Sequence, residues 1–337
     1  METGTRDDLG GRLALTTAFS DVPDPRVVGR SKYDLVERLV ISVCALVCGI
    51  EDFVGIESWS KERIDWLRRV LPALSAGQVV AIDGKASRRS RKQGLPPLHW
   101  VSAFATEARL LLGQDACAEK SNELTAMPVL LEFLMLKGVI VTLNTMGTHS
   151  HIAQAIFHKE TDYVLAVKDN QPKLADSIMD FFEIGQAAGW KNAPHSFVES
   201  AEKNYGRLKV RRGWAFSQLD CLAEPQQWPN LKRFGVIEAE RTINDKTRIE
   251  RRRYIGRIAP DAGLLANAVR AYWGIENQVH WCLDVAFKED QRRAREKNAA
   301  ANLATRRRFV LNRFRLDTTP KQGSIYNRRI LAASSDR

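Results

Sequence analysis

The feature that most constrains the fold is an alternation of short apolar runs with amphipathic segments, which begins at residue 78. The runs at 79–83 ("VVAID"), 138–144 ("GVIVTLN") and 162–170 ("DYVLAVKDN") are rich in β-branched residues and have the length of strands. The segments between them carry apolar residues at helical spacing. Strands that alternate with helices predict an α/β core with a mixed sheet.

The regions before and after this core follow other patterns. Residues 32–74 have helical periodicity and predict a small helical unit at the front of the chain. The runs "HWVSAFATE" and "RLLLGQDAC" predict two strands joined tightly around Glu107 and Ala108. Arg-rich segments with β character between 197 and 257 predict an insertion, which precedes two final helices.

Charge and cysteine usage restrict the class of protein. The net charge is +11 and the pI is about 9.5, which favours a polyanionic partner, either nucleic acid or an acidic membrane surface. The longest apolar stretch, 39–50, is too short to span a bilayer, and the N-terminus lacks the apolar core of a signal peptide. Five scattered cysteines indicate reduced thiols in a cytosolic protein. Cys44 and Cys48 fit a pair of core thiols better than a metal pair.

Three polar residues fall where a metal centre can form. Asp83 ends the first predicted strand, Asn144 ends the fourth, and Glu276 lies on the long helix near the C-terminus. Ligands of open α/β sheets gather at the carboxyl ends of strands. Two divalent ions about 4 Å apart can activate a nucleophile and stabilise the leaving oxygen of a phosphodiester. The pattern favours phosphoryl transfer, although Asp before Gly is also ordinary turn chemistry.

Clusters of cations accompany these residues. Lys85 lies two residues after Asp83 and so on the same side of an extended chain, where it can contact phosphate or be a plain surface lysine. As a set, given the fold, the arginine clusters favour contact with backbone phosphates, although a charge run is usually a solvated face. The residues that we predict to bind DNA are Lys85, Arg88, Arg89, Arg211, Arg212, Arg306 and Arg307.

The helix that carries Glu276 has further side chains with two interpretations. His280 and Asp284 follow Glu276 at steps of four, so the three share a face that could bind metal or border a core. Trp273 and Trp281 have the spacing of core residues, which is the interpretation we favour over stacking on an extruded base.

Several segments together resemble a known family. "AIDGK", "HWVSAFATEARLLLGQ", "DYVLAVKDNQ" and "YWGIENQVHWCLDVAFKED" are similar to the DDE transposases of bacterial insertion sequences, in particular the ISAs-type or H-repeat-associated family. The likeness covers about residues 13–315, and the pattern "IEN..HW.LDV.F.ED" is its most specific part. The resemblance implies an RNase H-like domain at 78–315 with a β-rich insertion at about 197–257. It also implies an N-terminal associated helical domain at 13–76, followed after residue 315 by a basic tail at 316–337.

The resemblance also implies a site of three acids that hold two Mg²⁺ ions. Asp83 matches the first acid and Glu276 the third, whereas Asn144 stands where the family has Asp. A neutral amide oxygen can coordinate Mg²⁺ but lacks the charge that offsets dehydration of the ion, so we expect weakened metal binding. Asp169 is the nearest candidate in sequence for compensation. The segment before Asp83 is shorter than the family's by several tens of residues.

These observations lead to a ranked set of functions. The first is a transposase that binds double-stranded DNA at insertion-sequence ends and target, and performs metal-dependent cleavage and strand transfer. We expect it in the bacterial cytoplasm at the nucleoid, as a homo-oligomer on DNA and without a membrane role. The alternative is a catalytically inactive DNA-binding remnant, because Asn144 replaces the second acidic ligand. A third interpretation is a host-directed nuclease on the same fold.

Overall fold

The computed structural model describes residue 22 and residues 74–91, 96–117, 123–204, 207–244, 246–294, 299–316 and 323–334. The predicted N-terminal helical domain at 13–76, with Cys44 and Cys48, lies outside the described residues apart from Val22 and 74–76. In the described part of the chain, no helix is long and apolar enough to cross a membrane.

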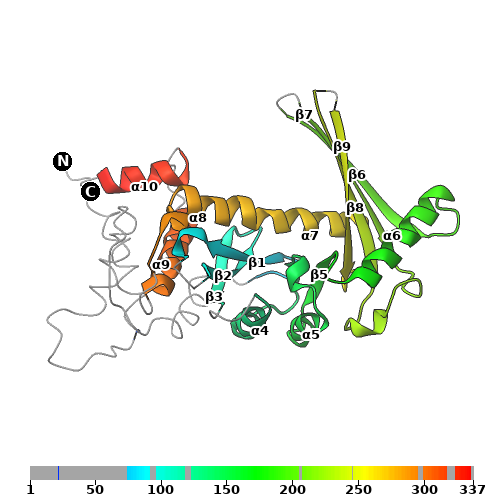
Figure 1. The fold of residues 1–337 in the computed structure, drawn as a ribbon, viewed down its shortest axis with the longest axis horizontal. Coiled ribbons are helices and arrows are strands. Elements are labelled where there is room, and N and C mark those ends of the chain that lie inside the picture. Colours follow the sequence, from blue (N-terminus) through cyan, green and yellow to red (C-terminus); the bar gives the residue numbers. More distant parts are fainter. Residues whose placement is uncertain are drawn as a thin grey trace, which may run out of the picture.

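A mixed sheet forms the centre of the described structure (Figure 1). Its strand order is β3-β2-β1-β4-β5-β9-β8-β7-β6. The first three strands pair antiparallel, and β4 and β5 run parallel to β1. The strands are β1 (Val79–Ser87), β2 (Leu98–Ala105), β3 (Leu110–Ala116), β4 (Ile140–Leu143), β5 (Asp162–Val167), β6 (His195–Asn204), β7 (Arg207–Phe216), β8 (Arg233–Ile243) and β9 (Lys246–Gly256).

Helices cover both faces of this sheet (Figure 1). One face packs against α4 (Glu123–Phe133), α5 (Ser150–His158) and α6 (Pro172–Ala187). The other packs against α7 (Ala262–Ile275), α8 (Trp281–Val285) and α9 (Ala299–Leu316), and α10 (Ile325–Ser334) contacts α9. The predicted α/β fold with an RNase H-like mixed sheet is therefore confirmed.

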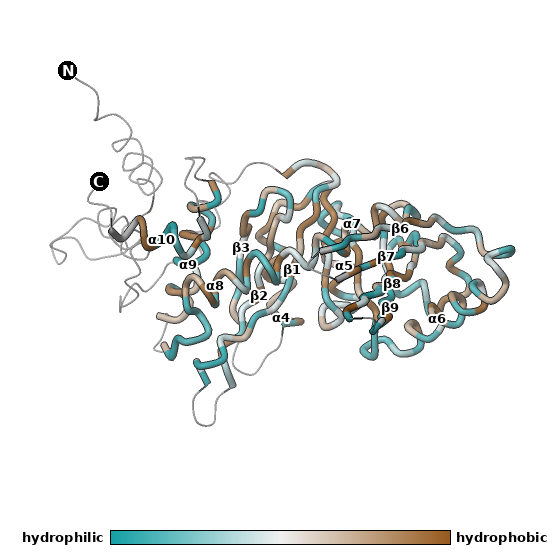
Figure 2. The backbone as a smooth tube through the Cα atoms, turned by 90° about the horizontal axis from the view of Figure 1, so that it is seen from above, coloured by the Kyte–Doolittle hydropathy of each residue, from teal (hydrophilic) through white to brown (hydrophobic). Residues whose placement is uncertain are grey.

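Alternation along β1 explains why this strand is buried on both sides. Val80 and Ile82 point into the core beneath α4 and α5, whereas Ala81 points into the core beneath α8 and α9. Figure 2 shows that hydrophobic stretches lie among the strands and helices at the centre, while hydrophilic ones are frequent in the loops at the margin. Because successive side chains alternate, Asp83 faces the α7 side of the sheet.

The predicted insertion extends the same sheet. Strands β6 to β9 form an antiparallel meander that joins β5 through β9. The sequence pattern identified β7, β8 and β9 but not β6, which pairs with β7 over its whole length. Part of the predicted basic tail is helical, since α10 lies within it.

Candidate metal and catalytic site

The position of Asp83 follows from how β1 is paired. Its parallel pairing with β4 ends at Ile82 and Leu143, so Asp83 and Asn144 are the next residues along two neighbouring strands. The prediction that the strand ends at Asp83 is wrong, because β1 continues to Ser87 and pairs with β2. The expected location is nevertheless correct, since Asp83 lies at the carboxyl edge of the parallel pair.

Glycine is required at position 84 of β1 for a steric reason. A Cβ atom at this position would overlap the Glu123 carboxylate, which is buried and lies 2.8 Å from His99 Nε2. Only glycine lets the start of α4 pack this closely against β1. The Asp-Gly pair is thus a site of close approach rather than a turn.

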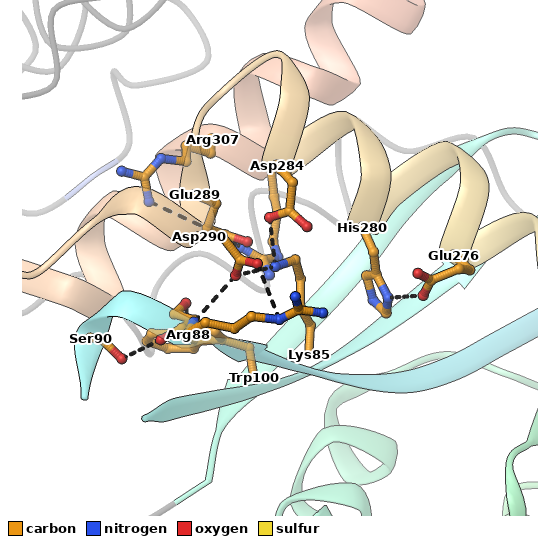
Figure 3. Close-up of polar contacts among 12 residues, drawn as sticks. Lys85, Arg88, Ser90, Trp100, Glu276, His280, Asp284, Glu289, Asp290 and Arg307 are labelled. Atoms are coloured by element: carbon orange, nitrogen blue, oxygen red, sulfur yellow. Dashed lines mark hydrogen bonds and ion pairs between the residues drawn. The ribbon is translucent and has the colours of Figure 1, made fainter. Parts of the chain in front are cut away.

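A local change of helix type aligns the second half of the site. Between α7 and α8 the helix runs on through a π-helical segment at Glu276–His280. Such widened turns are frequent at functional sites, and the extra residue in the turn redirects the side chains that follow. Figure 3 shows Glu276, His280 and Asp284 in succession along this helix, with His280 and Asp284 directed towards β1 and Glu276 directed towards His280.

Four polar groups surround the Asp83 carboxylate. Its Oδ1 accepts hydrogen bonds from the Tyr272 hydroxyl at 2.7 Å and from Asn144 Nδ2 at 2.8 Å. Its Oδ2 lies 3.7 Å from His280 Nδ1, which in turn lies 2.9 Å from Glu276 Oε2. Burial raises the pKa of Asp83, and the nearby His280 and the Tyr272 hydrogen bond oppose this effect.

The orientation of Asn144 is set by the backbone. Its Oδ1 accepts a hydrogen bond from the Gly147 amide at 3.0 Å, at the start of a short 3₁₀ turn. The amide NH₂ group therefore faces Asp83. In this arrangement Asn144 offers the site a hydrogen-bond donor, whereas a cation requires an oxygen.

A different set of three residues meets the requirements of a cation site. Asp83, Glu276 and His280 each contribute a ligand atom, and these atoms lie within 4.8 Å of one another. Two carboxylates suit Mg²⁺ or Mn²⁺, and an imidazole is a ligand of softer divalent ions. The residues present thus fit one divalent cation. His280 was noted in the sequence only as a neighbour of Glu276 on one helix face, and the structure adds its contact with Asp83.

A cavity of about 520 Å³ opens beside these acids. Asp83, Asn144 and Glu276 line it, together with residues of β5, β9 and α7. Trp273 also lines it and carries the Arg252 guanidinium 4.5 Å from its ring centre. Asp169 is not among the lining residues; its exposed carboxylate lies 3.6 Å from Lys168 Nζ.

The tryptophans differ from their sequence interpretation. Trp273 is 43% exposed and Trp281 is 59% exposed, so the prediction that both belong to the core is wrong. Trp214 is buried among Phe182 and Trp190. For Trp281, helical spacing gave the wrong interpretation because this residue follows the π-helical segment, where the usual periodicity shifts.

Lys85 lies inside the protein rather than on its surface. It is 7% exposed, and its ammonium lies 2.7 Å from Asp284 and 3.0 Å from Asp290 (Figure 3). Arg88 is exposed and lies 3.5 Å from Asp290, and Arg89 is also exposed. Lys85 can contact DNA only if these carboxylates release it.

The other predicted DNA-binding arginines are also engaged within the protein. Arg211 pairs with Glu202 at 3.2 Å, and Arg212 bonds three glutamates at once. Arg306 and Arg307 are buried in α9, where Arg307 lies 3.8 Å from Glu289. Phosphate contact by these residues stays a prediction, and it requires that internal contacts be exchanged for external ones.

Comparison of the sequence with known proteins identifies the family to which these site residues belong. The model of a family described as "Transposase DDE domain" matches residues 74–313, and one described as "DDE_Tnp_1-associated" matches residues 16–81. A protein of Escherichia coli O157:H7 named "Putative transposase YncI" is 31% identical over 94% of this chain and 90% of its own. The "H repeat-associated putative transposase YhhI" of Escherichia coli K12 is 30% identical over 95% of this chain and 94% of its own. These alignments span 357 and 363 positions, more than the 337 residues of this chain, so both relatives contain residues that have no counterpart here.

Proposed function

The chain belongs to the DDE transposase family of bacterial insertion sequences, and we propose that it binds the ends of its own element and performs metal-dependent cleavage and strand transfer on DNA. The observation that carries this proposal is the group Asp83, Glu276 and His280, whose ligand atoms lie within 4.8 Å beside a cavity. We further propose Mg²⁺ as the cation, because carboxylate oxygens are the ligands it prefers, and assembly of more than one copy on the DNA.

The roles of the side chains follow from their contacts. A divalent cation held by Asp83 and Glu276 would activate the attacking oxygen and neutralise charge on the leaving oxygen. Tyr272 fixes the Asp83 carboxylate by its hydrogen bond, and His280 orients Glu276. Arg252 lines the same cavity and bonds Glu250 at 2.8 Å, so it can contact the phosphates of a DNA strand by exchanging this internal contact for an external one.

A second candidate function is favoured by one observation. Asn144 donates a hydrogen bond to Asp83 and so occupies one oxygen of the first acid, while its own oxygen is bound to Gly147. This arrangement supports a protein that folds and binds DNA but holds cations weakly. Such a remnant would occupy element ends without cutting them.

One experiment separates the two functions. The chain, its Asn144→Asp variant and its Glu276→Gln variant would be incubated with Mg²⁺ or Mn²⁺ and a duplex that carries the flanks of the gene. Nicking at the element ends would be read on a sequencing gel, and binding would be read by gel retardation. The Glu276→Gln variant keeps the size of the side chain but removes its charge, so it controls for a contaminating nuclease.

Each outcome identifies a different function. Cutting by the natural chain, abolished in Glu276→Gln, supports the active transposase. Cutting by Asn144→Asp alone supports the remnant. Absence of specific binding by any folded variant contradicts both functions.

A further inference from the structure

Strands β6 to β9 form an extension of the sheet, here called the arm. The arginines on one of its faces are paired with carboxylates, whereas cations on the other face are not. The tips of β7 and β9 project beyond α7, on the side away from α4 and α5 (Figure 1). Alternation places Gly213 and Ile237 on the face that packs against α7, and Phe216 and Phe234 on the face that packs against α6. The charged residues nearer the tip continue these two faces.

On the α6 face, the charges of the arginines are neutralised by glutamates of the same sheet. Arg212 bonds Glu199 at 2.6 Å, Glu238 at 3.0 Å and Glu240 at 2.8 Å. Arg251 bonds the second oxygen of Glu238 at 2.8 Å. Arginines that are matched by carboxylates in this way stabilise the sheet and present little free charge to a partner.

The α7 face carries a row of three cations that lie opposite one another across the strands. Lys209 of β7 is paired in register with Arg241 of β8, which is paired in register with Arg248 of β9. Among the described residues, none of the three has an ion pair within 4.0 Å. Glu202, which lies opposite Lys209 on β6, is instead bound by Arg211 and Arg270.

Such a row of like charges opposes folding, and an anion outside the sheet would relieve this repulsion. Like charges directly opposite in an antiparallel pair are destabilising, because their Cβ atoms lie only about 4.5–5.5 Å apart. Arg241 and Arg248 are exposed, so their charges face solvent. Neighbouring strands lie about 4.8 Å apart, so the row spans about 10 Å, which is the axial rise across about four successive phosphates of one DNA strand at intervals of about 3.4 Å.

The row also lies on the same side as the candidate site. Arg248 and Arg252 point to the same face of β9, and four residues of strand separate them by about 13 Å. Arg252 lines the cavity that Asp83 and Glu276 share. A duplex that enters this cavity can therefore continue along the arm towards its tip.

We propose that Lys209, Arg241 and Arg248 form a contact surface for the phosphate backbone of double-stranded DNA adjacent to the site of cleavage. This inference rests on the proposed function and adds to it the surface that holds the DNA next to the reacting phosphate. The contact is to phosphates, so it is independent of sequence.

The test compares two triple variants of the full chain that lose the same charge. One is Lys209→Gln, Arg241→Gln and Arg248→Gln. The control replaces three exposed lysines around α6 and the start of β8 by Gln, namely Lys173, Lys191 and Lys232. Binding to a 30-bp duplex of the gene's flank, and to a scrambled duplex, would be measured by fluorescence anisotropy between 50 and 200 mM NaCl.

The arm variant should bind both duplexes more weakly and show a salt slope smaller by about 2 to 3, since each phosphate contact contributes about 0.9. Over this fourfold range the natural chain then loses roughly 15- to 60-fold more affinity than the arm variant. The control should keep most of the natural slope. The melting temperature of the arm variant should be equal to or above that of the natural chain at low salt, which excludes misfolding as the cause.

Two results overturn the proposal and differ in what they imply. If the natural chain binds DNA and the arm variant keeps its affinity and slope, the surface is wrong and the proposed function stands. If the folded natural chain binds neither duplex at any salt concentration, the proposed function fails and this surface fails with it.

Discussion

Replacement of Asn144 by Asp should convert a site held by a hydrogen bond into one that depends on a cation. In the natural chain, Asn144 Nδ2 donates to Asp83 at 2.8 Å. A hydrogen bond to a charged group contributes about 1.5–3 kcal/mol, and the variant loses it. The bond from Gly147 to the Oδ1 position can remain, so the new carboxylate keeps its orientation and turns a second oxygen towards Asp83.

The magnitude follows from the charges. Two carboxylates about 4 Å apart repel by about 4 kcal/mol at an effective dielectric constant near 20. The total loss of stability cannot exceed about 4 kcal/mol, because one carboxylate can instead take up a proton, and protonation of an ordinary Asp at pH 7 costs about that much. We therefore expect Asn144→Asp to lower the free energy of unfolding by about 3–4 kcal/mol at pH 7 without a cation. This loss corresponds to a decrease in melting temperature of about 10 °C.

The same reasoning predicts how the stability of the variant changes with pH and with added cations. A carboxylate pair has a raised pKa in the folded state, so the folded variant binds more protons than its unfolded chain and gains stability relative to the natural chain as the pH falls from 7 to 5. A cation that binds only the folded state also restores stability, by about 2.7 kcal/mol at a concentration 100 times its dissociation constant.

Thermal unfolding would be followed by circular dichroism at pH 5.5 and 7.5, with EDTA, Mg²⁺ or Mn²⁺. Asn144→Ala is the matched control, since it removes the hydrogen bond without adding a charge and should gain no cation dependence. The reasoning is refuted if Asn144→Asp is as stable as the natural chain in EDTA at pH 7.5 and its melting temperature responds no more strongly to cations.

Three other substitutions test single features of the site. Burial raises the pKa of Asp83, so ionisation of this residue lowers the stability of the fold at pH values above the ordinary Asp pKa near 4. Asp83→Asn should therefore raise the melting temperature at pH 7, and this gain should vanish at pH 3. Lys85→Met should lower the free energy of unfolding in urea by about 2–4 kcal/mol, because it leaves Asp284 unpaired and Asp290 with only its contact to Arg88. Arg89→Met at an exposed position should change it by less than about 0.5 kcal/mol. Gly84→Ala should cost about 2–3 kcal/mol through its overlap with Glu123, and a double variant with Glu123→Ala should lose less than the sum of the two single losses; additive losses would contradict the proposed overlap.

Sequence reasoning located the acids because strand ends and helix positions follow from periodicity. Asp83 and Glu276 were expected to meet at one edge of the sheet, and the structure places both on the same cavity. The reasoning failed for the strand that carries Asp83, because an Asp-Gly pair is usually a turn signal. The close approach of Glu123, which makes Gly84 necessary, depends on a residue about forty positions away and is not visible in local sequence.

The predicted DNA contacts show a second property that the sequence does not reveal, namely which arginines face solvent. A run of arginines has the same composition whether its charges face solvent or glutamates, and only the register of the strands decides between them. In the segment 207–216, Arg212 lies among three carboxylates while Lys209 lies beside another cation. Arg306 and Arg307 were expected at the surface, but α9 packs between β3 and α10, and both are buried.

The geometry around Asp83 shows how this carboxylate is held beside Asn144, at the position where the resemblance to the family predicts a second acid. In a site with Asp at position 144, two buried carboxylates would face each other and a cation would be needed to hold them together. Here the amide of Asn144 and the hydroxyl of Tyr272 both donate to Asp83, so its charge is compensated by neutral donors. The same bonds compete with any cation for the Asp83 oxygen. Stability of the fold without metal and affinity for metal are therefore opposed at position 144, and one residue decides the balance between them.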